Sequence, residues 1–401
     1  MLEDFGADLI INRLQNKGFE AYYVGGCVRN YLLGKQIDDY DLTTSASPEI
    51  VCEIFNDFKI FTTGIKHGTV SIIVNDRVYE LTTFRTDGKY LDARHPTSVT
   101  YCVNINEDLS RRDFTINAIA FNKKLGFIDN FNGIYDIKKG LIKCVGDPKT
   151  RFSEDALRIL RALRFASVYS LEIEEKTSQA IFKSLHLLKS ISAERISIEI
   201  GKIILGEKAS VILNDYKEVL FEILPQLKLI DDFQLVLSVL AECPKSLELR
   251  FAVLLYQINE YFDEISTIFK FSNAIKDKIS LLIKMHGCDY NSKASIKRLI
   301  RVFEKTVFDF FDFEFAIATA INDENKLIEI KTARILATEI INNGECYSLK
   351  QLAINGHDLL ELGYKGRQIQ QGLNFLLDGV VEERVVNNKN SLIKYLMGNN
   401  G

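Results

Sequence analysis

The amino-acid sequence predicts an α+β fold, in which an N-terminal region of mixed strands and helices precedes a region built almost entirely of helices. In roughly the first 145 residues, short runs of β-branched and aromatic residues alternate with glycines and other turn residues. After Pro148 these runs disappear, and apolar residues recur at three- and four-residue spacing, as at Leu157, Leu160 and Leu163. Only Pro225 and Pro244 follow, so few residues interrupt the helices.

Six short runs in the N-terminal region are rich in strand-forming residues. Turn residues separate them, and Gly133, Gly140 and the Asp147-Pro148 pair close the region. The predicted strands are 22–24, 40–43, 59–62, 69–74, 78–84 and 99–103.

The chain has 401 residues and a formal charge of −4, which is long enough for about two to four domains with apolar cores. No apolar run approaches the ~18 residues of a membrane span, and Met1-Leu2-Glu3-Asp4 lacks the layout of a signal peptide. The seven cysteines are scattered, which argues against a zinc site and a disulfide framework. We therefore expect a cytoplasmic protein without a membrane partner.

The strongest functional signal is the Gly25-Gly26 pair, which follows a short apolar strand and leads into a helix-forming segment with Arg29. Glycines let a phosphate approach the backbone, and helix amides and a guanidinium favour an anion. Asp39 and Asp41 follow, two residues apart on a predicted strand, so both side chains face one side and can bind a divalent cation. Either signal alone also fits a plain turn or solvated acids. Together they indicate a nucleotidyl transfer site.

Two further features are open to either of two readings. From Lys270 to Lys305 there are nine Lys and Arg against three acids, which fits either an RNA-backbone contact, with Lys297, Arg298 and Arg301 as candidates, or a solvated helical face. His67, in the turn Gly64 to Thr69, fits equally a turn-stabilising hydrogen bond or a place near the nucleotide.

Five motifs, in order and spacing, resemble the head and neck of class II tRNA nucleotidyltransferases, the family of CCA-adding enzymes and bacterial poly(A) polymerases. The resemblance is strong over roughly residues 20 to 200 and resumes weakly in a tail similar to that of short bacterial CCA-adding enzymes. The five motifs are Gly25-Gly26-x-Val28-Arg29, Asp39-x-Asp41, Glu80 to Arg85, Arg111 to Ala118 and Glu154 to Arg161; the tail matches at Ile354 to Leu359, Gly363, Gly366 and Asn387.

The resemblance implies a head that is a five-stranded nucleotidyltransferase palm, followed by a helical neck, body and tail. The expected ranges are 1–147 for the catalytic head, 148–207 for the neck that recognises the nucleotide base, 208–305 for the body and 306–401 for a tail that binds tRNA. Residues 249–256 stand where some longer relatives carry a His-Asp metal site, and neither residue is present there. No phosphohydrolase activity is therefore expected.

The resemblance also assigns roles to individual residues. Asp155 and Arg158 would pair with the edge of the incoming base, for which a carboxylate acceptor and a guanidinium donor are suited. Arg161 and Arg164 follow at three-residue steps and would face the same cleft, although the run also fits an exposed helix with a Glu154–Arg158 pair.

In the head, the resemblance makes Arg112 and Asp113 the contact to ribose and phosphate, where a surface ion pair is the alternative. Glu80 resembles a third carboxylate beside Asp39 and Asp41 that would orient the primer hydroxyl, but it also fits an ordinary exposed strand residue.

The expected reaction is attack of the tRNA 3′-terminal hydroxyl on the α-phosphate of CTP or ATP, with Mg²⁺ held by Asp39 and Asp41. Arg29, the Gly26 amide and Arg112 would bind the outer phosphates. Two positions depart from the family. Asn30 stands where the family usually has Asp, so the role of that acid is either dispensable or met by the neutral amide. Asp92-Ala93-Arg94-His95-Pro96 differs twice from the usual Asp-Gly-Arg-Arg-Pro, which affects the phosphate contacts expected of this loop.

Full CCA addition is the first choice of product, because the segment 85–96 has the full length that CC-only relatives lack. An A-only enzyme keeps this segment too and stays open. Poly(A) polymerase is less favoured, since those relatives have a more basic C-terminal region. An inactive RNA-binding protein is disfavoured by intact Asp39, Asp41 and Arg158. The sequence does not decide between a monomer and a homodimer.

Overall fold

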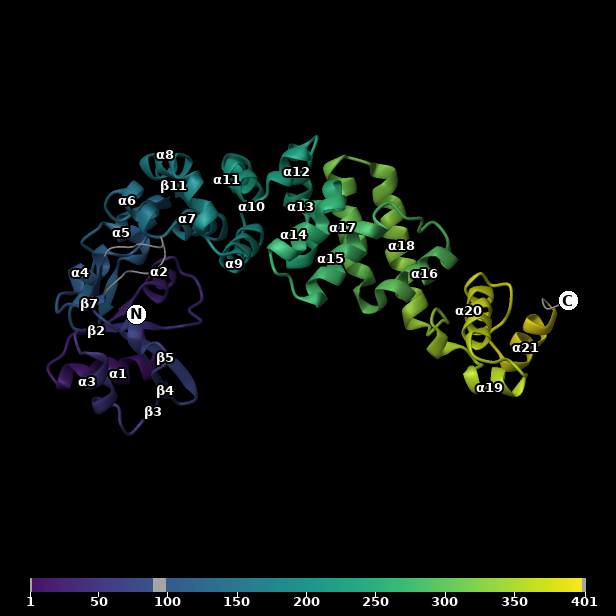
Figure 1. The fold of residues 1–401 in the computed structure, drawn as a ribbon, viewed down its shortest axis with the longest axis horizontal. Helices are drawn as coiled ribbons and strands as arrows, with labels where there is room; N and C mark the ends of the chain where they lie inside the picture. Colours follow the sequence, from purple (N-terminus) through teal and green to yellow (C-terminus); the bar gives the residue numbers. More distant parts are fainter. Residues whose placement is uncertain (1, 89–98, 399–401) are drawn as a thin grey trace. The chain divides into compact units, whose positions relative to one another are not determined.

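The computed structural model describes residues 2–88 and 99–398 and divides into two compact units. The first unit comprises Met1–Lys228 with Thr267–Lys270, and the second comprises Leu229–Ser266 with Phe271–Gly401. The first unit thus holds all of the predicted head and neck, together with the start of the predicted body. Figure 1 shows the strands confined to the N-terminal part of the chain and helices in the rest, which confirms the predicted α+β class.

The central sheet of the first unit has seven strands in the order β3-β4-β5-β2-β1-β8-β9, so the expectation of five strands was wrong. The two additional strands, β8 and β9, follow the Arg111 to Ala118 motif and have three residues each, too few for an alternating pattern to show. The strands are β1 (Ala21–Val24), β2 (Asp41–Thr44), β3 (Lys59–Phe61), β4 (Thr69–Val74), β5 (Arg77–Thr83), β8 (Ala120–Asn122) and β9 (Gly126–Ile128).

The register at the centre of the sheet places two acidic residues side by side. β2 runs parallel to β5, and Asp41 is directly opposite Glu80, while β1 pairs antiparallel with the other edge of β2. β2 begins at Asp41, one residue after the predicted start of the run 40–43, and Asp39 lies two residues before the strand, although both acids were expected on one strand. The sixth predicted run forms β7 (Val99–Tyr101), which pairs with β6 (Arg85–Asp87) in a separate hairpin.

Short helices cover the sheet and connect its strands. α1 buries Ile10, Ile11 and Leu14, and its N-terminal amides are capped by Asp4. This acid also accepts hydrogen bonds from Tyr79 and Arg77, which anchors the helix to β5. The helices of the head are α1 (Phe5–Asn16), α2 (Gly26–Leu32), α3 (Pro48–Ile54), α4 (Ile105–Ser110) and α5 (Gly133–Lys139).

The rest of the first unit is helical, apart from a two-residue strand, β11 (Glu172–Ile173), which pairs with β10 (Leu141–Ile142) and was not predicted. α7 packs closely on α9: the Ser167 hydroxyl donates to the Ile203 carbonyl at 2.7 Å, and a side chain at Gly206 would collide with Ser167. The helices are α6 (Pro148–Glu154), α7 (Leu157–Tyr169), α8 (Glu175–Lys183), α9 (Ala193–Ile204), α10 (Ala209–Asp215) and α11 (Lys217–Ile223).

In the second unit, as far as the structure describes it, helices are the regular elements. Figure 1 shows α19, α20 and α21 gathered near the C-terminus, around an apolar core that includes Leu359, Leu376, Leu377 and Leu392. The helices are α12 (Phe233–Glu242), α13 (Leu247–Leu255), α14 (Phe262–Ile268), α15 (Asn273–Met285), α16 (Lys293–Phe303), α17 (Val307–Ala320), α18 (Glu324–Asn342), α19 (Gly356–Glu361), α20 (Arg367–Val381) and α21 (Lys389–Gly398).

The tail motif that resembles short bacterial CCA-adding enzymes has a structural basis. Asn355 caps α19 by accepting from the amides of His357 and Asp358, and Asp358 accepts from the Asn355 amide in return, which forms a capping box. Asn387 bridges the amide of Ala353 and the carbonyl of Gln351. These residues fix the start of α19.

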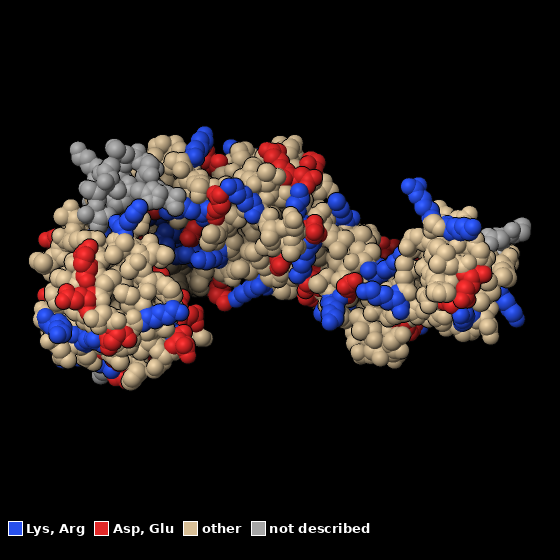
Figure 2. All heavy atoms as spheres, turned by 60° about the horizontal axis from the view of Figure 1, so that its bottom comes forward, with Lys and Arg blue, Asp and Glu red and all other residues tan. Residues whose placement is uncertain are grey.

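The basic residues of α16 face acids of the tail. Lys297 is buried and its ammonium lies 2.9 Å from Glu345, while Arg298 pairs with Glu382 and Arg301 lies 3.6 Å from Asp378. Lys276 and Lys278 likewise lie 2.8 Å from Asp263 and Asp309, so several basic residues of the stretch Lys270 to Lys305 are paired with acids. Figure 2 shows Lys and Arg interspersed with Asp and Glu over the face drawn.

Candidate functional site

A cavity of about 550 Å³ lies where the head meets α7 and α9, within the first unit. Its lining comes from four parts of the chain: the turn before α2, the start of β2, the segment after α4, and α7 with α9. The volume is in the range of small-molecule sites. The lining residues are Gly25, Gly26, Arg29, Asp41, Arg112, Asp113, Asn117, Arg161, Arg164, Phe165, Val168, Tyr169, Lys202 and Leu205.

Gly25 shows why the turn needs glycine. Its φ is +71°, and a Cβ atom there would lie 3.1 Å from Nη1 of Arg112 and 3.7 Å from a carboxylate oxygen of Asp41. A side chain would therefore be strained and would also press on the cationic and the acidic groups of the cavity. The bare backbone leaves the space between Arg112 and Asp41 open to a ligand.

Asp41 lies at this edge of the cavity, with its carboxylate reached by solvent but surrounded by protein on several sides. Removal from water raises the pKa of Asp41, and the charges of Glu80 and Asp39 raise it further, against the opposing charges of Arg112 and Arg29. Neighbouring carboxylates that repel each other are stabilised by a cation. Neither Asp39 nor Glu80 lines the cavity itself, but both act on Asp41 from beside it.

This group of oxygen ligands suits a hard divalent cation such as Mg²⁺, which usually takes one or two carboxylates together with substrate phosphates and water. Within residues 2–88 and 99–398, no three Asp, Glu, His or Cys side chains form a ready-made metal site. The carboxylates of Asp41, Asp39 and Glu80 are oxygen donors of the kind that such a cation takes.

Arg29 projects from α2 into the cavity and is buried. Its Nη1 donates to Asn117 at 2.7 Å and its Nη2 donates to the Tyr169 hydroxyl at 2.7 Å, while Nε and Nη2 both donate to Asn30. Its guanidinium also stacks on the rings of Phe165 and Tyr169. Burial lowers the pKa of Arg29, so its positive charge is held in surroundings poor in water, where an anion is favoured.

Asp113 and Arg161 form an ion pair on the cavity wall. One carboxylate oxygen of Asp113 accepts from Nε of Arg161 at 2.7 Å, and the other accepts from Asn117 and from the Phe114 amide. Burial alone would raise the pKa of Asp113, but the charge of Arg161 and these hydrogen bonds lower it to about 2. Arg161 is oriented by this pair, as Arg164 is by Glu199 at 3.1 Å.

The Asp113 pair makes a pH-dependent contribution to stability. An unfolded Asp titrates near pH 3.9, so a carboxylate with a pKa of about 2 contributes about 2 to 3 kcal/mol above pH 4 and loses it as the pH falls toward 2. We expect Asp113→Asn to lower the Tm at pH 7 by several degrees. The difference in Tm between the variant and the wild type should shrink as the pH falls below 3. A gap that stays constant from pH 7 to pH 2.5 would contradict the ionised pair.

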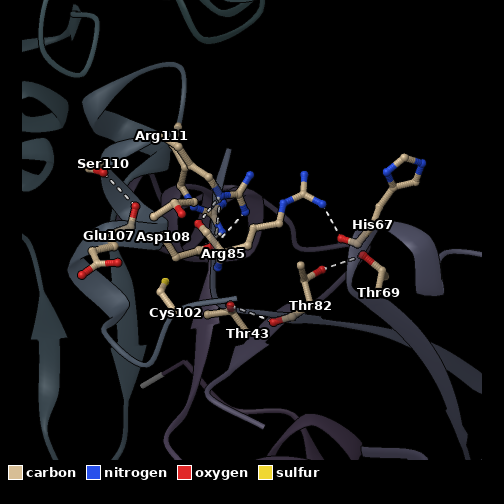
Figure 3. A network of polar contacts seen from close by, with 12 residues as sticks. Thr43, His67, Thr69, Thr82, Arg85, Cys102, Glu107, Asp108, Ser110 and Arg111 are labelled. Carbon is tan, nitrogen blue, oxygen red and sulfur yellow. Dashed lines mark hydrogen bonds and ion pairs between the residues drawn. The ribbon is translucent and has the colours of Figure 1, made fainter. Parts of the chain in front are cut away.

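Asp108 connects the arginines of the motif Arg111 to Ala118 to the β6–β7 hairpin (Figure 3). This fully buried carboxylate accepts from Arg111 at 2.6 Å, from Arg112 at 3.1 Å and from the backbone amide of Arg85 at 3.3 Å. The charges of both arginines keep the pKa of Asp108 below its usual value against the effect of burial. Arg112 is thereby held in position: its Nη2 donates to Asp108, and its Nη1 lies close to the backbone of Gly25.

Asp155 and Arg158 do not line the cavity. Asp155 accepts from Arg195 at 2.9 Å and from the Leu157 amide at 3.0 Å, at the start of α7. Arg158 is buried, pairs with Glu154, and donates to the carbonyls of Arg151 and Arg111. In this structure the polar groups of both side chains therefore bind protein partners, and the Glu154–Arg158 pair considered from the sequence is present.

Other sequence expectations are placed as follows. His67 is exposed and does not line the cavity; its carbonyl accepts from Arg85, and its ring points away from the network (Figure 3). Asn30 bonds to Arg29 and Tyr169. In α13, Arg250 donates to the carbonyls of Cys243 and Pro244. The altered segment 92–96, and residues 89–96 of the segment considered for product choice, lie outside the described residues.

Several cavity residues were not predicted as site residues. Asn117 belongs to a quoted motif, and its place after Asp113 could have pointed to it. Phe165, Val168, Tyr169 and Leu205 look like ordinary core positions of helices, so the sequence carried no signal for them. Lys202 stands on α9 with no motif around it.

No helix within the described residues is both long and apolar enough to cross a membrane.

Models of three protein families match successive parts of the chain. They are described as "Poly A polymerase head domain" for residues 21–143, "Probable RNA and SrmB- binding site of polymerase A" for residues 170–229 and "tRNA nucleotidyltransferase domain 2 putative" for residues 244–396.

Curated relatives and solved structures match over nearly the full length. The CCA-adding enzyme of Lactobacillus helveticus is 36% identical over 402 residues, covering 96% of this chain and 95% of the relative. That of Anoxybacillus flavithermus is 35% identical, covering 97% and 96%. The crystal structure of the Bacillus stearothermophilus CCA-adding enzyme in complex with CTP aligns with a TM-score of 0.80 at 30% identity, covering 98% of this chain and 96% of that one.

Proposed function

This chain belongs to the family of CCA-adding enzymes, and from this premise we propose how its residues bind the triphosphate, the metal and the tRNA end. It is a nucleotidyltransferase that adds C, C and A to the 3′ end of tRNA from CTP and ATP. The observation that carries the proposal is the single cavity wall in which Arg29, Asp41 and Arg112 meet at the Gly25-Gly26 turn.

The test of this function is a set of incubations with separate tRNAs that end before the first C, after the second C, or with the complete CCA. With CTP alone the first should gain two residues, with ATP alone the second should gain one, and the complete tRNA should gain none. Repeated addition of A to any of the three would instead indicate poly(A) synthesis. Failure of the first tRNA to accept C would indicate an A-only enzyme.

Enzymes of this family generally depend on a metal ion, and we assign Mg²⁺ to Asp39 and Asp41 with phosphate oxygens of the nucleotide as further ligands. Bound there, Mg²⁺ would supply Lewis-acid chemistry, lowering the pKa of the attacking hydroxyl and offsetting the negative charge of the phosphates. To Glu80, which lies opposite Asp41 on β5, we assign the role of orienting the terminal hydroxyl of the primer; the register of the two strands supports this.

The chain's own cations bind the triphosphate. Arg29 and Arg112 take the outer phosphates, with the Gly26 amide between them, because these groups converge on the open side of the turn. The negative charge that develops as pyrophosphate leaves is stabilised by the same fixed guanidiniums, which need no rearrangement at the moment of reaction. Asp113 contributes to nucleotide binding by holding Arg161 on the cavity wall, and Glu199 contributes by holding Arg164 there.

Base selection is assigned to Asp155 and Arg158 of the neck. Both now bind protein partners, so a nucleotide base would have to exchange with Arg195 on Asp155 and with Glu154 on Arg158. A carboxylate acceptor beside a guanidinium donor matches the amino group and ring nitrogen that C and A share on their pairing edges.

The four-part domain division, the cytoplasmic location and the choice between monomer and homodimer stay predictions.

A third prediction concerns tRNA binding by α16. Arg298 and Arg301 remain partly exposed, whereas Lys297 is buried between acids. Arg298→Gln with Arg301→Gln should therefore weaken tRNA binding and reduce the salt slope by up to ~0.9 log-log units for each duplex phosphate that is no longer neutralised. Lys297→Met serves as the comparison and should mainly lower the Tm. A salt slope unchanged in the double variant would assign these arginines to contacts with the tail alone.

A further inference from the structure

Tyr169 ends α7 and reaches across from the neck to the head. Its hydroxyl accepts from Nη2 of Arg29 at 2.7 Å and donates to the side-chain oxygen of Asn30 at 3.1 Å. Its ring lies under the same guanidinium, 4.6 Å from ring centre to Cζ, and stacks on Phe165. Both residues that the hydroxyl bonds belong to α2, the helix that follows the Gly25-Gly26 turn.

The acceptors that hold Arg29 are neutral. Among the described residues, its hydrogen-bond partners are the amide oxygens of Asn30 and Asn117 and the phenol of Tyr169. Asp113, which accepts from the Asn117 amide, has its other carboxylate oxygen bonded to Arg161 instead. Neutral partners fix the plane of a guanidinium without cancelling its charge, so the attraction for a bound anion is kept.

We propose that Tyr169 is a positioning residue for nucleotidyl transfer: from the neck, it fixes the orientation of Arg29 so that the guanidinium charge faces the phosphates of the incoming nucleotide. This rests on the proposed role of Arg29. Because a phosphate is common to CTP and ATP, the effect of Tyr169 is on affinity for either triphosphate and not on the choice of base.

Two variants separate the hydroxyl from the ring. Tyr169→Phe keeps the stacked ring and removes the hydrogen bond, and Tyr169→Leu removes both. A hydrogen bond to a charged group corresponds to roughly ten- to a hundredfold in an equilibrium constant, and only part of this reaches the nucleotide because Tyr169 acts through Arg29. Loss of the ring contact adds to the effect. We expect the Kd of CTP and of ATP, measured by calorimetry without tRNA, to rise about three- to tenfold in Tyr169→Phe and further in Tyr169→Leu.

The matched control is Tyr216→Phe. Tyr216 is another tyrosine of the first unit, buried, with its hydroxyl 2.9 Å from Ser178 and its ring stacked on Phe182, but it does not line the cavity. A loss of general stability would appear in this variant as well. A change in triphosphate Kd should appear in Tyr169→Phe and be absent in Tyr216→Phe.

The link through Arg29 is tested by a double-mutant cycle. If Tyr169 acts by orienting Arg29, then Tyr169→Phe should have little further effect on the Kd once Arg29 is changed to Lys, and the two effects should not add. In turnover on tRNA, Tyr169→Phe should raise KM for CTP and ATP and, because Arg29 also stabilises the leaving pyrophosphate, lower kcat for both by a similar factor. The preference for CTP over UTP should be kept.

Additive effects in the cycle, or an unchanged Kd in a folded Tyr169→Phe variant, would overturn the proposal. A shift in the CTP-to-UTP preference would also overturn it, because it would make Tyr169 part of base selection. These outcomes are separate from the fate of the proposed function, which is decided by CCA addition in the wild type.

Discussion

Asp41→Ala and Asp39→Ala should each abolish nucleotide addition while the protein stays folded. Asp41 reaches the cavity from the start of β2, and its carboxylate is crowded by Glu80 and Asp39, so its removal costs little packing and relieves the repulsion. Without either ligand, the cation that the reaction needs has too few protein oxygens to hold it. The measurement is CCA addition at matched Mg²⁺ concentration, with the Tm of each variant recorded in parallel.

Asp38→Ala is the matched control for this prediction. Asp38 is an exposed acid next to Asp39, and its carboxylate accepts from Gln36. The Asp38 variant should keep wild-type turnover, and the Tm of all three variants should lie close to that of the wild type. Comparable turnover in Asp41→Ala would remove the proposed metal site, and a large fall in its Tm would mean that the carboxylate stabilises the head.

Asp155→Asn and Arg158→Ala should impair the choice of nucleotide more than the rate of the reaction. Each good contact to a base edge corresponds to ~1–3 kcal/mol of discrimination, or roughly 5- to 150-fold in the ratio of correct to wrong nucleotide. Asparagine at 155 keeps an oxygen for the amide of Leu157, the first residue of α7, and removes the charge. Arg158→Ala should affect selection of both C and A, because one guanidinium serves each in turn. The measurement is single-turnover incorporation of all four triphosphates on tRNA that lacks its CCA end.

The control for base selection is Arg195→Ala. Arg195 holds Asp155 at 2.9 Å, so this variant removes the ion pair and leaves the carboxylate that would contact the base. Fidelity should fall in Asp155→Asn and be largely kept in Arg195→Ala. Equal and uniform losses of rate in both variants, with fidelity preserved, would show that Asp155 only positions α7, and the protein template would then have to be given up for this chain.

Motifs with local chemistry were predictable from the sequence, and contacts made across the fold were not. Gly25 and Asp41 were identified because each belongs to a short pattern with a physical meaning, and Arg112 was identified from the family resemblance. The structure brings all three together around one cavity. Tyr169 and Phe165 reach the same cavity from a helix whose apolar spacing looks like any core face. Their position depends on how α7 packs on the head, which no local pattern encodes.

The errors in the fold have a similar cause. Strands of three residues such as β8 and β9 are stabilised by pairing with neighbours in the sheet, and their own sequence is too short to show alternation. For the same reason, the start of β2 was predicted one residue too early, and Asp39, expected on the same strand as Asp41, lies before it. Burial of Lys297 between acids of the tail also depends on tertiary packing, whereas the sequence shows only the excess of basic residues.

All residues that line the cavity lie between Gly25 and Leu205, within the first of the two units. Mutations in the helices of the second unit can therefore accumulate without touching the groups that bind the triphosphate. Natural selection on the groups that line the cavity and natural selection on the helices of the second unit thus act on separate stretches of the gene. Over evolutionary time such an enzyme can change its C-terminal half, by drift or by exchange, while keeping one inherited reaction.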